Sequence, residues 1–116
     1  MAILDAARTF ALTLPGAFED HPWGECVVKV AVGSKSRIFV FLGGPGDDRR
    51  GMGVKLPETG LRALERDDAE PSGYGLGKSG WVSFGFTQLP PDDAIQGWVL
   101  ESYRAVAPKK LVRQLG

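Results

Sequence analysis

The sequence contains one histidine, His21, and one cysteine, Cys26, two residue types that often act as bases, nucleophiles or transition-metal ligands. A structural zinc site takes four ligands, mainly cysteine and histidine, so one of each does not predict a zinc site or any other metal centre. A nucleophile activated by His21 would have to be Cys26 or Ser34, and no G-x-S-x-G motif accompanies either residue. We therefore interpret His21 as a loop residue beside Trp23, and Cys26, on the apolar face of a predicted strand, as a buried small hydrophobic residue.

Two further patterns are typical of enzymes, but neither has the required spacing. Glu19 and Asp20 are adjacent, and adjacent carboxylates rarely converge on one substrate as acid and base. Segment 75–80, Gly-Leu-Gly-Lys-Ser-Gly, ends like a phosphate loop. The full G-x-x-x-x-G-K-[ST] motif needs glycine where Ser72 stands, and it needs a helix where we expect a strand. These observations predict a protein that is not an enzyme and needs no cofactor.

Basic residues in or beside expected turns offer a different chemistry, because lysine and arginine bind nucleic-acid phosphates. The candidate nucleic-acid-binding residues are Lys35, Arg37, Arg49, Arg50, Lys55 and Lys78. The alternative is that these are ordinary solvated charges, with Asp47 and Asp48 offsetting the two arginines that follow them. A second basic group without acidic residues is Arg104, Lys109, Lys110 and Arg113. It equally suits a helix end that favours cations.

Three aromatic residues form an alternative candidate surface for a small molecule or a protein: Trp23, Tyr74 and Trp81. Trp23 lies in segment 14–24, whose two prolines and two glycines predict a shaped loop. We expect the Trp23 indole to be mostly buried at this corner, with contact to a ligand as the alternative.

Composition limits the class of protein. The 116 residues suit one domain, over 1–116, and the 14 basic and 14 acidic residues give no formal net charge, which argues against a strongly basic nucleic-acid binder. A single cysteine allows no intrachain disulfide, and no signal peptide or long apolar run is present. We expect a cytoplasmic protein without membrane contact, as a monomer or a weak dimer.

Hydrophobic spacing predicts the elements that position these residues. Helices are expected over 3–14, 57–66 and 91–107, strands over 25–32, 37–42, 52–56 and 81–86, a hairpin turn at 33–36, a loop over 67–80, and a last basic turn over 109–115. This order predicts an α+β fold, in which the N- and C-terminal helices pack on one face of an antiparallel sheet. Trp98 and Val99 should contact the sheet, and the other face should carry Lys29, Lys55 and Trp81.

Several segments, in order along the chain, resemble those of one known family. They are Leu14-Pro15-Gly16, Pro22-Trp23-Gly24, Val54-Lys55-Leu56-Pro57-Glu58, Pro71-Ser72-Gly73-Tyr74 with Ser79-Gly80-Trp81-Val82, and Glu101-Ser102-Tyr103-Arg104-Ala105-Val106. They resemble the MmcQ/YjbR family of small proteins with a frataxin-like (CyaY-like) α+β fold of the double-wing DNA-binding type. The resemblance implies DNA as the partner. Frataxins bind iron through an acidic first helix, and the first helix expected here has only Asp5, so no iron is expected.

The predicted function is therefore a non-enzymatic binding protein, with DNA as the leading partner. The alternative is binding of a small molecule or a protein at the aromatic surface. DNA binding requires the basic residues to converge on one face, whereas a ligand site requires the aromatic residues to converge on a cleft.

Overall fold

A computed structural model describes residues 2–21, 26–42, 51–72, 76–85, 90 and 93–115 of the chain. Within them, six strands form one sheet in the order β1-β2-β3-β4-β6-β5, and every neighbouring pair is antiparallel. The strands are β1 (Ala17–Asp20), β2 (Cys26–Val32), β3 (Lys35–Leu42), β4 (Met52–Lys55), β5 (Ala69–Pro71) and β6 (Trp81–Phe84). The helices are α1 (Ala2–Leu12), α2 (Gly60–Ala63), α3 (Ala94–Val106), α4 (Lys109–Arg113) and the 3-10 helix η2 (Leu76–Ser79).

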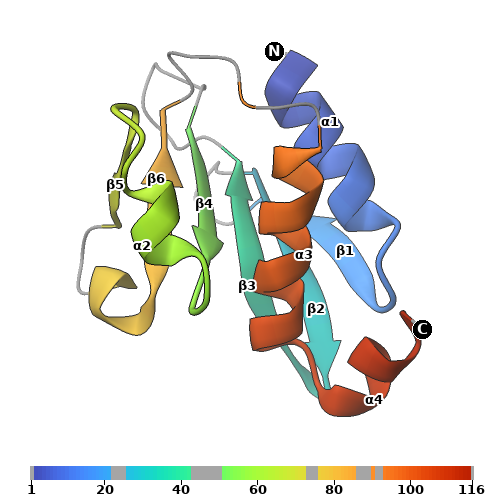
Figure 1. Cartoon of the computed structure of the whole chain (residues 1–116). Helices are drawn as coiled ribbons and strands as arrows, with labels where there is room; N and C mark the ends of the chain where they lie inside the picture. Colours follow the sequence, from blue (N-terminus) through green and yellow to red (C-terminus); the bar gives the residue numbers. More distant parts are fainter. Residues whose placement is uncertain are drawn as a thin grey trace.

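Helices α1 and α3 lie side by side across one face of the sheet (Figure 1). The predicted α+β fold, with both terminal helices packed on one face of an antiparallel sheet, is confirmed. The three consecutive antiparallel strands expected between residues 25 and 56 are present as β2, β3 and β4. Gly33 has a φ of +63° at the β2–β3 turn, a conformation that glycine adopts without the strain imposed by a Cβ. None of the described helices is long and apolar enough to cross a membrane.

Two strands were not predicted, and both lie at edges of the sheet. β1 occupies part of the segment 14–24 that we expected to be a loop, and β5 lies in the predicted loop 67–80. Both are short and lack a run of apolar residues: β1 reads Ala-Phe-Glu-Asp and β5 reads Ala-Glu-Pro. Edge strands have one open side and need no apolar alternation, which explains why their sequences gave no strand signal.

A β-bulge in β3 changes which side chains face the helices. Val28 pairs with Val40 but Lys29 pairs with Ile38, so Phe39 has no partner on β2. Phe39 and Val40 are therefore both fully buried, and the Phe39 ring meets Tyr103 of α3 edge-on at 5.3 Å. The regular alternation expected for this strand is interrupted at this one residue.

Helix α3 is attached to the sheet by apolar contacts and by one buried hydroxyl group. Val99 is fully buried, and the Trp98 indole stacks on Phe84 with ring centroids 4.3 Å apart, as predicted for the sheet-facing side. The Ser102 hydroxyl donates to the Phe39 carbonyl at 2.5 Å and accepts from the Lys55 amide at 2.8 Å. This buried polar group is thus satisfied by two strands at once.

Helix α2 is shorter than the predicted segment 57–66, and it uses different residues for packing. Leu61, which we expected on its apolar side, is 85% exposed, whereas Gly60 and Ala63 are buried. A Cβ at Gly60 would lie 3.6 Å from both Leu56 and Val82, so the small residues set how closely α2 approaches the sheet. Of the two leucines, Leu61 and Leu64, whose spacing predicted the apolar side of this helix, only Leu64 packs against the core.

The other face of the sheet carries the residues expected there. Lys55 lies directly opposite Trp81 in the β4–β6 register, and side chains of directly opposed residues share a face. Trp81 is only 9% exposed and meets Phe41 edge-on at 5.5 Å. Lys29 pairs with Asp20 at 2.8 Å. Predictions for Trp23, Arg49, Arg50 and Tyr74 lie outside the described residues.

Candidate functional site

The described basic candidates gather at one end of the sheet, where β2 ends and β3 begins. Lys35 is the first residue of β3, and Arg37 follows two residues later on the same face of that strand. Lys55 is the last residue of β4, and Lys78 lies in η2, just before β6. The second basic group joins them, because Arg104 is in the last turn of α3 and α4 folds back beneath the same strand ends (Figure 1). We call this set the basic end; it consists of Lys35, Arg37, Lys55, Lys78, Arg104, Lys109, Lys110 and Arg113.

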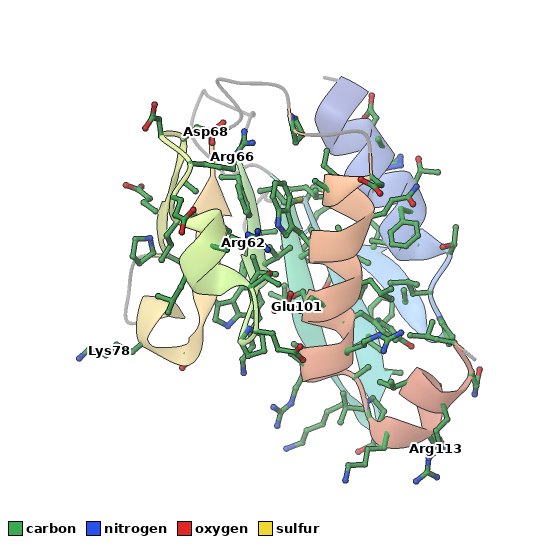
Figure 2. The ribbon with its side chains drawn as sticks, viewed as in Figure 1. Arg62, Arg66, Asp68, Lys78, Glu101 and Arg113 are labelled. Carbon is green, nitrogen blue, oxygen red and sulfur yellow. The ribbon has the colours of Figure 1, made fainter. Side chains whose placement is uncertain are left out.

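The cations of the basic end have no anionic partner among the described residues. Seven of them are exposed and Lys55 is half-buried. The ion pairs of the described chain involve other cations, namely Arg8, His21, Lys29 and Arg66. Lys78 and Arg113 point outward from the lower part of the molecule, away from Arg66 and Asp68 (Figure 2). These side chains can therefore bind an external anion without breaking an internal contact.

The basic end has two sides. Lys35 pairs with Val32 and Arg37 with the buried Val30, so both cations lie on the helix side of β3. Lys55 lies on the opposite side with Trp81. β3 ends at Leu42, seven residues or roughly 23 Å from Lys35 at about 3.3 Å per residue, and the predicted partners Arg49 and Arg50 lie outside the described residues.

The aromatic alternative is found in a different place from the one predicted. Of its three residues only Trp81 is described; its ring is buried against Phe41, and it contributes to the lining of a cavity of about 260 Å³ that also includes Lys78. A cavity of about 440 Å³ lies between α2 and α3, within the usual size range for small-molecule sites. We call it the α2–α3 cavity; its lining includes Thr59, Arg62, Arg66, Gly97, Trp98 and Glu101.

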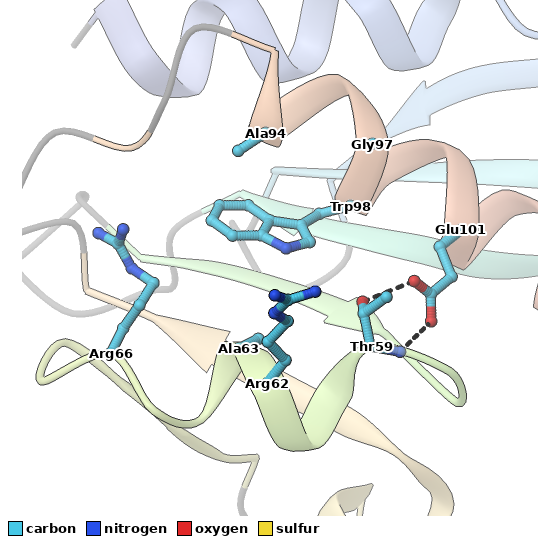
Figure 3. Close-up of a pocket in the computed structure, with 8 residues that line it drawn as sticks. All are labelled: Thr59, Arg62, Ala63, Arg66, Ala94, Gly97, Trp98 and Glu101. Atoms are coloured by element: carbon cyan, nitrogen blue, oxygen red, sulfur yellow. Dashed lines mark hydrogen bonds between the residues drawn. The ribbon is translucent and has the colours of Figure 1, made fainter.

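The α2–α3 cavity combines an indole with guanidinium groups (Figure 3). Trp98 extends from α3 over the space, and Arg62 reaches toward it from α2. Arg66 lies 5.8 Å from the indole centroid and donates to both carboxylate oxygens of Asp68 at 2.8 Å. Arg66 is thus held in place, whereas Arg62 is exposed and makes no ion pair with the described residues.

Glu101 closes one side of the cavity and joins its two helices. One carboxylate oxygen accepts from the amides of Glu58 and Thr59, at 2.8 and 3.0 Å, and the other accepts from the Thr59 hydroxyl at 2.6 Å. These amides precede α2, where backbone donors lack helical partners. Glu101 is therefore a structural clamp, with its charge directed at backbone amides and not at a ligand.

A third cluster contains His21 and Cys26, for which the sequence predicted no shared site. Glu19, His21 and Cys26 each place one potential metal-ligand atom within 4.8 Å of the other two. Cys26 is half-buried, not fully buried as predicted, because its sulfur lies at the start of β2 beside these polar side chains. Burial, followed by the negative charge of Glu19, raises the pKa of the Cys26 thiol.

The remaining perturbed groups are structural. The Lys29 ammonium, followed by the His21 amide, lowers the pKa of Asp20. Burial raises the pKa of Tyr103, whose hydroxyl donates to the Pro15 carbonyl at 2.6 Å. Neither group lies in the α2–α3 cavity.

Sequence reasoning missed the cavity and the three-residue cluster for identifiable reasons. Trp98 has helical spacing typical of a core residue, and its packing on Phe84 follows that spacing. Arg62 and Arg66 are four residues apart, a spacing that predicts one helix face, but only the leucines of this segment were assigned to a packing face. The Glu19–His21–Cys26 cluster requires β1, which had no sequence signal.

The fold and these sites describe a small α+β protein with a basic end and a modest cavity between α2 and α3. The family model described as YjbR matches residues 12–105, so the chain belongs to the YjbR family. It is similar to the crystal structure of Deinococcus radiodurans protein DR2400, which has a domain described as DUF419. That similarity has a TM-score of 0.74 and 28% identity, and covers 97% of this chain and 87% of the other. No curated protein matches the sequence.

Proposed function

We propose that this YjbR-family protein is a non-enzymatic, cytoplasmic protein that binds double-stranded DNA through its basic end. The observation that carries the proposal is the gathering of eight cations, none of them ion-paired within the described residues, at one end of the sheet. Phosphate contacts supply most of the sequence-independent affinity for DNA. A chain with no net charge can still provide such a surface when its charges are segregated.

The proposal is tested by fluorescence anisotropy with a labelled duplex at several salt concentrations. If four of these cations each neutralise one phosphate, the logarithm of the association constant should fall against the logarithm of salt with a slope of about −3.6. Absence of binding to the duplex at low salt would overturn the proposal. Equal affinity for single-stranded DNA would show that the protein is attracted to phosphate charge and does not recognise the geometry of a duplex groove.

Charge-neutralising variants locate the contact. Lys109→Gln with Lys110→Gln should reduce the slope by about 1.8, since each phosphate contact contributes roughly 0.9. Lys35→Gln with Arg37→Gln should do the same if the helix side is the binding side. The matched control is Arg8→Gln with Lys29→Gln, which removes two charges that already have partners in Glu19 and Asp20. A control variant with the same reduction would show that only total charge matters.

A second candidate function is binding of a small aromatic anion in the α2–α3 cavity. It is favoured by one specific combination in the cavity lining, the Trp98 indole beside the guanidinium of Arg62, which makes no ion pair with the described residues. A flat ring can stack on the indole while a carboxylate or phosphate pairs with the guanidinium.

Calorimetric titration with 2-naphthoate and with adenosine monophosphate tests this second candidate. Arg62→Gln should weaken either ligand without changing the fold, because the side chain is exposed. Gly97→Leu should block binding by occupying the cavity, since nothing lies within 4 Å of a Cβ at this position. Binding that survives both substitutions would place the ligand elsewhere.

A further inference from the structure

The β1–β2 pair brings three different metal-ligand types to one point beside α1. Glu19 and His21 are two residues apart and therefore share a face at the end of β1. The β1–β2 register pairs Asp20 with Val27, and its continuation places His21 opposite Cys26. A carboxylate oxygen, an imidazole nitrogen and a thiol sulfur thus lie within 4.8 Å of one another, all on described residues.

We propose that Glu19, His21 and Cys26 form a binding site for a divalent transition-metal ion of the zinc type. A thiolate and an imidazole select zinc, cobalt or nickel over magnesium and calcium, which prefer oxygen ligands alone. When the thiol loses its proton on binding, the thiolate and carboxylate together supply two negative charges, which balance the charge of the ion. Three protein ligands leave a fourth tetrahedral position for water or a small ligand.

The contacts among Glu19, His21 and Arg8 already resemble those expected around a bound metal ion. The His21 Nε2 atom lies 2.8 Å from one carboxylate oxygen of Glu19, while the Arg8 Nε atom lies 3.3 Å from the other oxygen. A metal ion would take the place of the proton between His21 and Glu19, and Arg8 would continue to orient the carboxylate from outside.

The adjustment required on binding is small. Ligand atoms about 2.0–2.3 Å from a tetrahedral ion are roughly 3.3–3.7 Å apart, so donor atoms separated by up to 4.8 Å must approach by little more than 1 Å. The side chain of His21 is 58% exposed and free to make this movement. The ion would join the end of edge strand β1 to the start of β2, so binding should also stabilise this edge of the sheet.

Cobalt absorption spectroscopy of the full-length, reduced protein tests the site. Titration with Co²⁺ should produce a thiolate-to-cobalt charge-transfer band that saturates at one equivalent and disappears when Zn²⁺ is added. Mg²⁺ in large excess should not displace the cobalt. Absence of a saturable band in the unmodified protein would overturn the proposal without reference to any variant.

Substitutions then separate a three-ligand site from a lone cysteine that scavenges metal. Cys26→Ser should abolish the band, and His21→Gln and Glu19→Gln should each weaken Co²⁺ binding at least tenfold. The matched control is Asp20→Asn, whose carboxylate lies on the opposite face of β1 beside Lys29 and should not affect the affinity. A band that depends on Cys26 but is unchanged in His21→Gln and Glu19→Gln would reject the site. Circular dichroism of each variant verifies that the fold is retained.

Discussion

Charged residues are arranged differently at the two ends of the sheet. At the end where β3 finishes, Arg66 pairs with Asp68, Arg8 and His21 meet Glu19, and Lys29 meets Asp20. At the basic end, no cation has an acidic partner among the described residues. Internal pairing therefore neutralises one end and leaves the other available for an external anion, although the whole chain has no net charge. The comparison shows why total charge is a poor guide to partners.

The largest expected effect concerns the paired end. Asp68→Ala should destabilise the protein by about 3–5 kcal/mol, because the Asp68 side chain is fully buried and its removal takes away the carboxylate that accepts two hydrogen bonds from the Arg66 guanidinium. Urea unfolding measures the change. Asp67→Ala, at the exposed neighbouring position, is the control and should stay within about 0.5 kcal/mol. A loss below 1 kcal/mol for Asp68→Ala would show that pairing is unimportant at this end.

The second prediction concerns a hydrogen bond that joins α3 to the segment before β1 near the basic end, where the described cations form no ion pairs. Tyr103→Phe removes the hydrogen bond to Pro15 and should cost about 1 kcal/mol. Burial raises the pKa of Tyr103 in the folded state, so its contribution is complete below the unfolded pKa of about 10 and is lost as pH rises through the folded value. Unfolding curves between pH 8 and 11 should show this alkaline decline only in the unmodified protein. An equal decline in both proteins would show that the loss of stability at alkaline pH comes from ionisable groups other than Tyr103.

A smaller effect is expected at acidic pH. Because Lys29 lowers the folded pKa of Asp20, this carboxylate stabilises the fold above its unfolded pKa, near 4, and the contribution disappears as pH falls through the folded value. Asp20→Asn should therefore flatten the acid side of the stability profile, measured by thermal unfolding between pH 2 and 5. Lys29→Gln should have the same effect, and a profile that differs between the two would show that they do not act as a pair.

The smallest effect on stability is expected at the basic end. Lys109→Gln with Lys110→Gln should change the free energy of unfolding by no more than about 0.5 kcal/mol, because both side chains are exposed and unpaired. The same urea assay measures it. A clear stabilisation would sharpen the comparison, since it would show that the clustered cations repel one another in the free protein.

Strong local patterns allowed the sequence to predict β2, β3, β4, α1 and α3. Alternation beside Gly33 located the hairpin, and helical spacing placed Trp98 and Val99 on the sheet. The edge strands could not be predicted, because Ala17–Asp20 and Ala69–Pro71 are too short to show a period. The basic residues could be identified as candidates, but their arrangement depends on strand register, which spacing within one strand does not determine.

The bulge at Phe39 determines on which face of the sheet Lys35 and Arg37 lie. Val40 faces the helices, so uninterrupted alternation would place Arg37 and Lys35 on the surface that carries Lys55. Deleting Phe39 would leave Arg37 opposite Val30 and Lys35 opposite Val32, whereas a β3 of the present length in which every residue paired with β2 would carry both charges on the other face. The direction of the electric dipole of the molecule thus depends on one residue remaining outside the β2–β3 pairing, because a regular strand of equal length and charge would present Lys35 and Arg37 to solvent on the opposite side.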